Sequence, residues 1–116
     1  MIKLSHDKKQ NRITLTYEGD VNAEEVEELY LKLQDLMPKC RRGFTVLADL
    51  SPANSVTKDS IPFIKKIMDL LNEHGISEII RVIPDPEKDI GFSILSVFHY
   101  GKGVKVVTCQ TLEEVA

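Results

Sequence analysis

Residues 12–18 alternate between polar and apolar side chains, which is the period of a β-strand with one buried and one exposed face. Apolar residues occupy every second position from Ile13 to Tyr17, within a strand expected over residues 12–18. Residues 2–5 form a shorter strand before it, and the polar segment 6–11 joins the two. We therefore expect a hairpin whose sheet is covered on one side only.

Two apolar stripes at the spacing of an α-helix come later in the chain. The first begins after Asn22, which together with Glu25 predicts a capping box, and it ends at Pro38. The second begins at Pro62, because proline cannot donate the backbone hydrogen bond needed beyond the first helical turn, and it ends at Gly75. The apolar positions are Val26, Leu29, Tyr30, Leu33, Leu36 and Met37 in the first stripe and Ile61, Ile64, Ile67, Met68 and Leu71 in the second.

The other segments alternate between strands and helices. Residues 43–50, 77–83 and 104–108 are mostly apolar runs, which are typical of strands in a buried sheet. Asp85-Pro86-Glu87 predicts the start of a third helix, and Thr111 with Glu114 predicts a short terminal helix. The order β-β-α-β-α-β-α-β-α predicts one α/β domain over residues 1–116, in which a mixed sheet begins with a hairpin and continues as right-handed βαβ units.

Composition narrows the class of protein. The 116 residues are 42% hydrophobic and 28% charged, which is typical of a globular domain. No apolar run approaches the roughly 20 residues of a membrane span, and the first residues lack the apolar core of a signal peptide, so we expect a cytoplasmic protein. The net charge of −3 and the absence of a basic stripe argue against nucleic acid as a partner. There is no glycine-rich phosphate loop and no metal-ligand spacing, so no cofactor is expected.

The cysteines and histidines do not form a recognisable catalytic motif. Cys40 follows the first helix and Cys109 follows the last strand, so they should lie at opposite edges of the sheet, roughly 20 Å apart, too far for a disulfide. His6, His74 and His99 lie on three separate elements. No Cys-His-acid arrangement can be identified from these positions, so no catalytic residue is assigned and we expect a protein that is not an enzyme.

The most polar connection of the predicted sheet lies between residues 49 and 60. In open α/β sheets, ligands bind beyond the carboxyl ends of the parallel strands, and this connection begins there. The predicted binding edge comprises Asp49, Ser51, Asn54, Ser55, Asp59, Ser60, Asp85, Lys88 and Asp89, with residues 109–111 nearby. Because Pro62 fixes the start of the second helix, Asp59 and Ser60 should lie at its N-terminus. Two alternatives stay open: the same residues are common caps and turn formers, and Asp59, Asp85 and Cys109 could serve a small enzyme.

Polar side chains in the middle of strands indicate that part of one sheet face is open. Thr14 and Thr16 lie in the hairpin, and Arg81 and Lys105 lie in the last two predicted strands. A partner could cover such a face. The alternative is that the long side chains of Arg81 and Lys105 cover apolar surface while their charged ends reach water.

With these elements placed, the chain resembles the STAS superfamily, which includes bacterial anti-anti-sigma factors. The resemblance rests on the strand ending in Asp49-Leu50-Ser51, the polar connection after it, Asp59-Ser60 at the start of an amphipathic helix, and the strand-helix-strand-helix order that follows. It implies that Ser60 is phosphorylated by a partner kinase and that only the unmodified form captures its partner. A phosphate at a helix N-terminus is stabilised by free amides, but it adds roughly −1.5 to −2 charges beside Asp59.

The leading hypothesis is a regulatory domain that binds a protein through residues 51–60, with Ser60 as a switch. The resemblance implies a kinase-like anti-sigma factor or another regulator as the partner. The alternative is a small-ligand or lipid-binding module of the same fold. A homodimer is compatible with either hypothesis.

Overall fold

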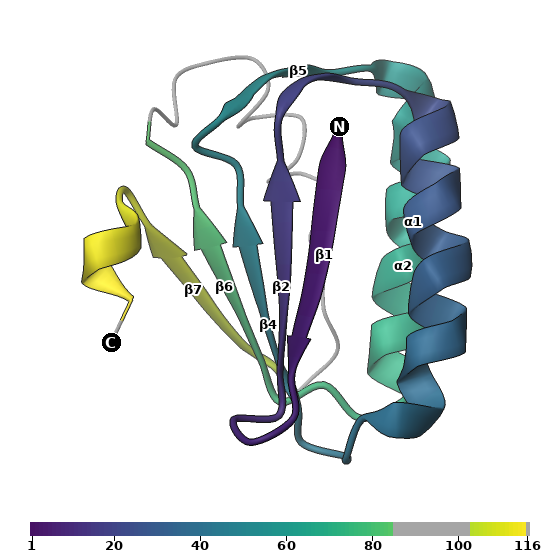
Figure 1. Ribbon diagram of the computed structural model, residues 1–116, viewed down its shortest axis with the longest axis vertical. Coiled ribbons are helices and arrows are strands. Elements are labelled where there is room, and N and C mark those ends of the chain that lie inside the picture. The colour runs from purple at the N-terminus through teal and green to yellow at the C-terminus, as the bar shows by residue number, and fades with distance from the viewer. Residues whose placement is uncertain (85–102, 116) are drawn as a thin grey trace.

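A computed structural model describes residues 1–84 and 103–115, and in this part of the chain a five-stranded sheet has the order β1-β2-β4-β6-β7 (Figure 1). Its strands are β1 (Ile2–Asp7), β2 (Arg12–Tyr17), β4 (Thr45–Asp49), β6 (Glu78–Val82) and β7 (Lys105–Cys109). β1 and β2 are antiparallel, whereas β2, β4, β6 and β7 run parallel to one another. The predicted α/β class with a mixed sheet and an N-terminal hairpin is therefore confirmed.

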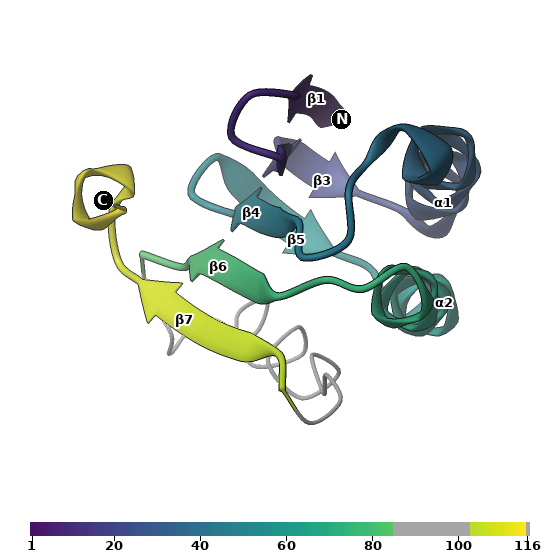
Figure 2. The ribbon, with the colours of Figure 1, turned by 90° about the horizontal axis from the view of Figure 1, so that it is seen from below.

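Helices α1 (Ala23–Leu36) and α2 (Ile61–Glu73) lie side by side on one face of this sheet (Figure 2). The predicted capping box at the start of α1 is present, because the Asn22 side chain accepts a hydrogen bond from the Glu25 amide and the Glu25 side chain accepts one from the Asn22 amide. The two apolar stripes pack on alternate residues of the central strands, with Phe44, Leu33 and Leu71 fully buried between the layers. A 3₁₀ turn, η1 (Met37–Lys39), extends α1.

Neither α1 nor α2 lies on the opposite face of the sheet. Leu47, Ile80, Val82 and Cys109 form a smaller apolar cluster there, and Val115 packs against it from the C-terminal segment. The turn beside it is η3 (Leu112–Glu114), a 3₁₀ helix. The predicted terminal helix with a Thr111–Glu114 capping box is therefore wrong. Glu114 instead accepts a hydrogen bond from the Gln110 amide, three residues are too few for an α-helix, and the Thr111 side chain forms no cap.

The strand register decides which of the mid-strand polar residues face the open side. Thr14, Thr16 and Lys105 alternate with residues on the helix side and therefore lie on the sheet face opposite α1 and α2. Arg81 does not, because it pairs with Ala48, a member of the helix-side core. Its guanidinium donates to the Thr108 hydroxyl at 3.0 Å and the residue is buried. The prediction that Arg81 lies on an open face is wrong.

Two short strands were not predicted from the sequence. β3 (Gly19–Val21) and β5 (Ala53–Val56) pair in parallel and form a separate two-stranded sheet. A 3₁₀ turn, η2 (Lys58–Ser60), then leads from β5 into α2. The third predicted helix, which starts at Asp85, lies outside the described residues. No helix of the described chain is long and apolar enough to cross a membrane.

Candidate functional site

The two connections that follow β2 and β4 are joined above the carboxyl end of the sheet (Figure 1). We call the joined segment, residues 19–21 with 53–56, the β3–β5 platform. Backbone hydrogen bonds extend the pairing at both ends, from the Gly19 amide to the Pro52 carbonyl at 2.9 Å and from the Thr57 amide to the Val21 carbonyl at 3.0 Å. Gly19 has a φ of +64°, which favours glycine, and this allows the chain to turn from β2 into β3. The most polar connection is thus an ordered surface.

Asp20 links the two halves of the β3–β5 platform through side chains. One of its carboxylate oxygens accepts hydrogen bonds from the Asn54 amide group and the Ser55 hydroxyl, both at 2.7 Å. These bonds, that from Ser55 first, lower the pKa of Asp20 below its usual value. The sequence predicted Asn54 and Ser55 as site residues but not Asp20. The sequence offered one signal for Asp20: the polar segment Glu18-Gly19-Asp20 comes directly after a predicted strand. Asp20 reaches this edge only because β3, which was not predicted, pairs with β5.

Asp49 and Ser51 form a local turn at the end of β4. Asp49 is buried and accepts hydrogen bonds from both the amide and the hydroxyl of Ser51, the amide at 3.0 Å. A carboxylate held in this way shapes the connection. Its structural role here agrees with the turn-former alternative for these two residues.

Asp59 and Ser60 lie where the sequence predicted them, at the start of α2, but their environments differ. Asp59 is exposed, whereas Ser60 is fully buried and its hydroxyl donates to the Thr57 carbonyl at 2.5 Å. Both residues belong to η2, in which the Ser60 amide also bonds Thr57. The Ser60 hydroxyl is therefore not accessible from the surface while this turn is closed.

The described part of the predicted edge separates into three local groups. Asn54 and Ser55 meet Asp20, Asp49 meets Ser51, and Ser60 bonds back to Thr57. The remaining predicted residues, Asp85, Lys88 and Asp89, lie outside the described residues. Within residues 1–84 and 103–115, no three His, Cys, Asp or Glu side chains gather closely enough to hold a metal ion.

A cysteine and a histidine meet at the opposite edge of the sheet, a pairing that the sequence did not predict. The Cys40 sulfur lies 3.8 Å from His6 Nε2 and 3.6 Å from the Leu36 carbonyl oxygen. Burial raises the pKa of the Cys40 thiol, which favours the neutral form and lowers its nucleophilicity. Both Cys40 and Cys109 are free thiols. The pair therefore has the character of a packing contact.

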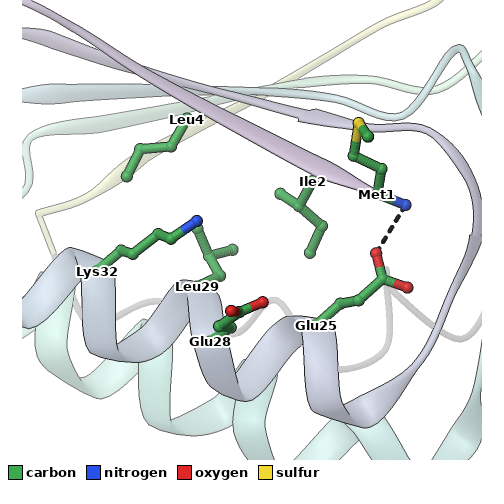
Figure 3. Close-up of a pocket in the computed structure, with 7 residues that line it drawn as sticks. All are labelled: Met1, Ile2, Leu4, Glu25, Glu28, Leu29 and Lys32. Atoms are coloured by element: carbon green, nitrogen blue, oxygen red, sulfur yellow. Dashed lines mark ion pairs between the residues drawn. The ribbon is translucent and has the colours of Figure 1, made fainter.

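A groove lies between β1 and α1, away from the predicted edge (Figure 3). It has a volume of about 320 Å³. We call it the β1–α1 groove, and it is lined by Met1, Ile2, Leu4, Glu25, Glu28, Leu29 and Lys32. The N-terminal amine closes one end by pairing with Glu25 at 2.7 Å.

Comparisons of the whole chain with known proteins define the fold. The anti-sigma factor antagonist SpoIIAA in its unphosphorylated form aligns with 99% of this chain and 93% of its own, at a TM-score of 0.68 and 14% identity. A Shewanella loihica protein with a SpoIIAA-like fold aligns with 98% of this chain and 88% of its own, at a TM-score of 0.68 and 10% identity. No protein-family model and no curated protein matches the sequence.

A third similar structure contains a protein complex. A chain in the crystal structure of the diguanylate cyclase SiaD with its activator SiaC, from Pseudomonas aeruginosa, aligns with 93% of this chain and 92% of its own. The TM-score is 0.64 and the identity is 14%. The chain thus has a SpoIIAA-like, STAS-type fold, which confirms the fold predicted from the strand ending at Asp49 and the helix start at Asp59-Ser60.

Proposed function

We propose that this domain is a non-enzymatic regulator that binds a protein partner through the β3–β5 platform and the start of α2. The observation that carries the proposal is the pairing of β3 with β5, which holds the connection from β4 to α2 in a defined position with Gly19, Asp20 and Asn54 exposed. An ordered surface loses less conformational entropy on binding than a flexible loop does. Two similar structures support the same role, since one is an anti-sigma factor antagonist and the other is a complex of a diguanylate cyclase with its activator.

Exposed polar side chains on this surface supply the specificity that such a partner would need. Asn54 and Asp59 are exposed, and Asp20 presents a carboxylate already fixed by two hydrogen bonds. Charged and amide groups held in this way select partners by complementary charge and hydrogen bonding.

A pair of charge-reversed variants tests this surface. Asp59→Arg changes the start of α2, whereas Glu113→Arg makes the same charge change at an exposed residue of η3. Each protein would be used to capture partners from an extract of the source cells, with quantitative mass spectrometry of what is retained. We expect wild type and Glu113→Arg to retain the same protein and Asp59→Arg to retain about tenfold less, equivalent to about 1.4 kcal/mol of binding free energy.

Equal capture by both variants would contradict the proposed surface. Native mass spectrometry of the freshly purified protein distinguishes this proposal from the small-ligand or lipid alternative. That alternative predicts a bound molecule, seen as a mass above that of the chain, which is lost when the protein unfolds. That alternative stays a prediction.

The switch at Ser60 is a second part of the proposal and rests on the position of this residue after Asp59. Its buried hydroxyl and its bond to Thr57 mean that modification requires η2 to open. A phosphate of about −2 charges cannot occupy the buried site of a hydroxyl, so the phosphorylated turn would stay open. The modified protein would then present a different surface at the start of α2.

Two substitutions at Ser60 test this mechanism without a kinase. Ser60→Ala removes one hydrogen bond and should lower the free energy of unfolding by about 1 kcal/mol. Ser60→Asp places an unpaired charge in a buried position and should cost more than about 2 kcal/mol while speeding amide hydrogen exchange across residues 57–61. Intact mass measurement of the protein purified from its own cells reports whether phosphate is present. Partner capture by Ser60→Asp equal to that by Ser60→Ala would contradict the switch and leave the proposed surface in place.

A further inference from the structure

The outer edge of β1 is one of the two edges of the five-stranded sheet in the described chain. β1 pairs with β2 on one side, and no other described strand pairs with it (Figure 1). An unpaired edge presents backbone N–H and C=O groups that can bind an added strand. Along β1, Ile2 and Leu4 are half-buried and face α1, while Lys3 and Ser5 are exposed on the other face.

The β1–α1 groove lies directly beside this edge. Ile2, Leu4 and Leu29 give it an apolar floor, and Glu28 and Lys32 stand on α1 along it (Figure 3). A strand added to β1 would direct every second side chain toward α1, because strand side chains alternate between faces. The groove therefore offers an apolar site to the side chains of an added strand, next to free backbone groups.

Negative charge surrounds the start of α1. A second hollow of about 310 Å³ adjoins the groove on the helix surface and is lined by Asn22, Glu24, Glu25, Glu27, Glu28 and Leu31. Together the two hollows are lined by four carboxylates and by two cations, Lys32 and the N-terminal amine, and that amine is paired with Glu25. Within the described residues Glu28 forms no ion pair. Leu31, 54% exposed, adds an apolar contact between these charges.

We propose that β1 and the β1–α1 groove bind an extended segment of a partner protein that carries an apolar side chain and a lysine or arginine two residues apart. The apolar side chain fills the groove over Leu4 and Leu29, and the basic one reaches Glu28 and the neighbouring carboxylates. The backbone of the segment pairs with the free edge of β1. The lining residues of this surface are different from those of the β3–β5 platform.

A second copy of the chain fits this surface less well. Two copies paired antiparallel through β1, about a two-fold axis perpendicular to the sheet, would place both helix layers on the same side of one continuous sheet, with the two α1 helices next to each other. Their facing surfaces would bring Glu24, Glu27 and Glu28 of each copy together, and like charges at an interface oppose association. The charge on α1 therefore selects a basic partner segment over self-association.

A displayed library of random decapeptides tests the inference on the full chain. Peptides are selected on wild type after depletion on Glu28→Lys, and the enriched sequences are synthesised. We expect alternating apolar and basic residues, with backbone amide shifts in nuclear magnetic resonance spectra confined to residues 1–7 and 24–32. Glu28→Lys should weaken binding at least about tenfold, whereas Glu113→Lys, an equal charge change on η3, should leave it unchanged.

Other results would overturn the inference. These are a failure to enrich any sequence, enriched peptides without basic residues, equal weakening by both variants, or shifts at residues 53–61. A concentration-dependent dimer in analytical ultracentrifugation that Glu28→Lys changes would assign the edge to a second copy. None of these outcomes alters capture through Asp59, so the two surfaces are tested independently.

Discussion

The Asp20 carboxylate accepts hydrogen bonds from Asn54 and Ser55, two residues from a different part of the chain. Because the bonds from Ser55 and Asn54 favour the charged carboxylate, its pKa is lowered in the folded protein. The group therefore stabilises the β3–β5 platform at pH values above the pKa of the unfolded chain. This contribution is lost as the pH falls through the lowered pKa of the folded protein.

A titration followed by nuclear magnetic resonance of the carboxyl carbon checks this sign. Replacing both donors, in Asn54→Ala/Ser55→Ala, should raise the pKa of Asp20 toward its usual value. Ser5→Ala, which removes an exposed hydroxyl on β1, serves as the control and should leave it unchanged. An Asp20 pKa that does not respond to loss of the two donors would show that the hydrogen bonds do not persist in solution.

At the scale of an element, α1 depends on the capping box at its N-terminus. Asn22→Ala leaves the Glu25 amide without its side-chain acceptor and should lower the free energy of unfolding by about 1 kcal/mol. Urea denaturation measures this change. Glu27→Ala, at an exposed position of the same helix, should alter the free energy by less than about 0.5 kcal/mol. Equal effects of the two substitutions would argue that the cap contributes no more than helix propensity does.

The elements themselves divide into those with a strong local pattern and those without one. The helix over residues 23–36 has both an apolar stripe and a cap, and it was predicted with its start correct. β3 and β5 have three and four residues, too few to show an alternating pattern, and each is a strand only because the other lies beside it. The 3₁₀ turn at residues 112–114 follows Thr111, a residue typical of helix starts, but the Thr111 side chain forms no cap.

At the scale of the whole molecule, the C-terminal segment covers part of the smaller apolar cluster on the sheet face opposite α1 and α2. Val115 packs against this cluster, in which Cys109 is only 7% exposed. Val115→Asp should therefore expose the cluster and speed the reaction of Cys109 with a thiol reagent severalfold, because a charged side chain disfavours the apolar contact. The rate at Cys40, which lies at the other end of the sheet, should not change.

Mass spectrometry after timed labelling gives the two cysteine rates separately. Glu113→Ala, an exposed change in the same turn, is the control and should label like wild type. If Val115→Asp and wild type labelled Cys109 at the same rate, the C-terminal segment would not cover this face in solution.

The sequence by itself determined the features that depend on neighbouring residues along the chain. Periodicity placed the central strands and both described helices, and Pro62 with Gly75 set the limits of α2 because proline and glycine act on the backbone locally. From these elements the STAS-like order and the position of Asp59 and Ser60 at the start of α2 followed.

The tertiary structure alone decided which of these residues are accessible and which meet. It buried Ser60 and turned Arg81 toward the helix side, and it brought Asp20 to Asn54 and Ser55 from 34 and 35 residues away. Burial and register depend on contacts between distant segments, for which a single sequence carries no local signal. The groove beside β1 could not be predicted for the same reason, because neither β1 nor α1 carries a sequence pattern that shows the two will pack together.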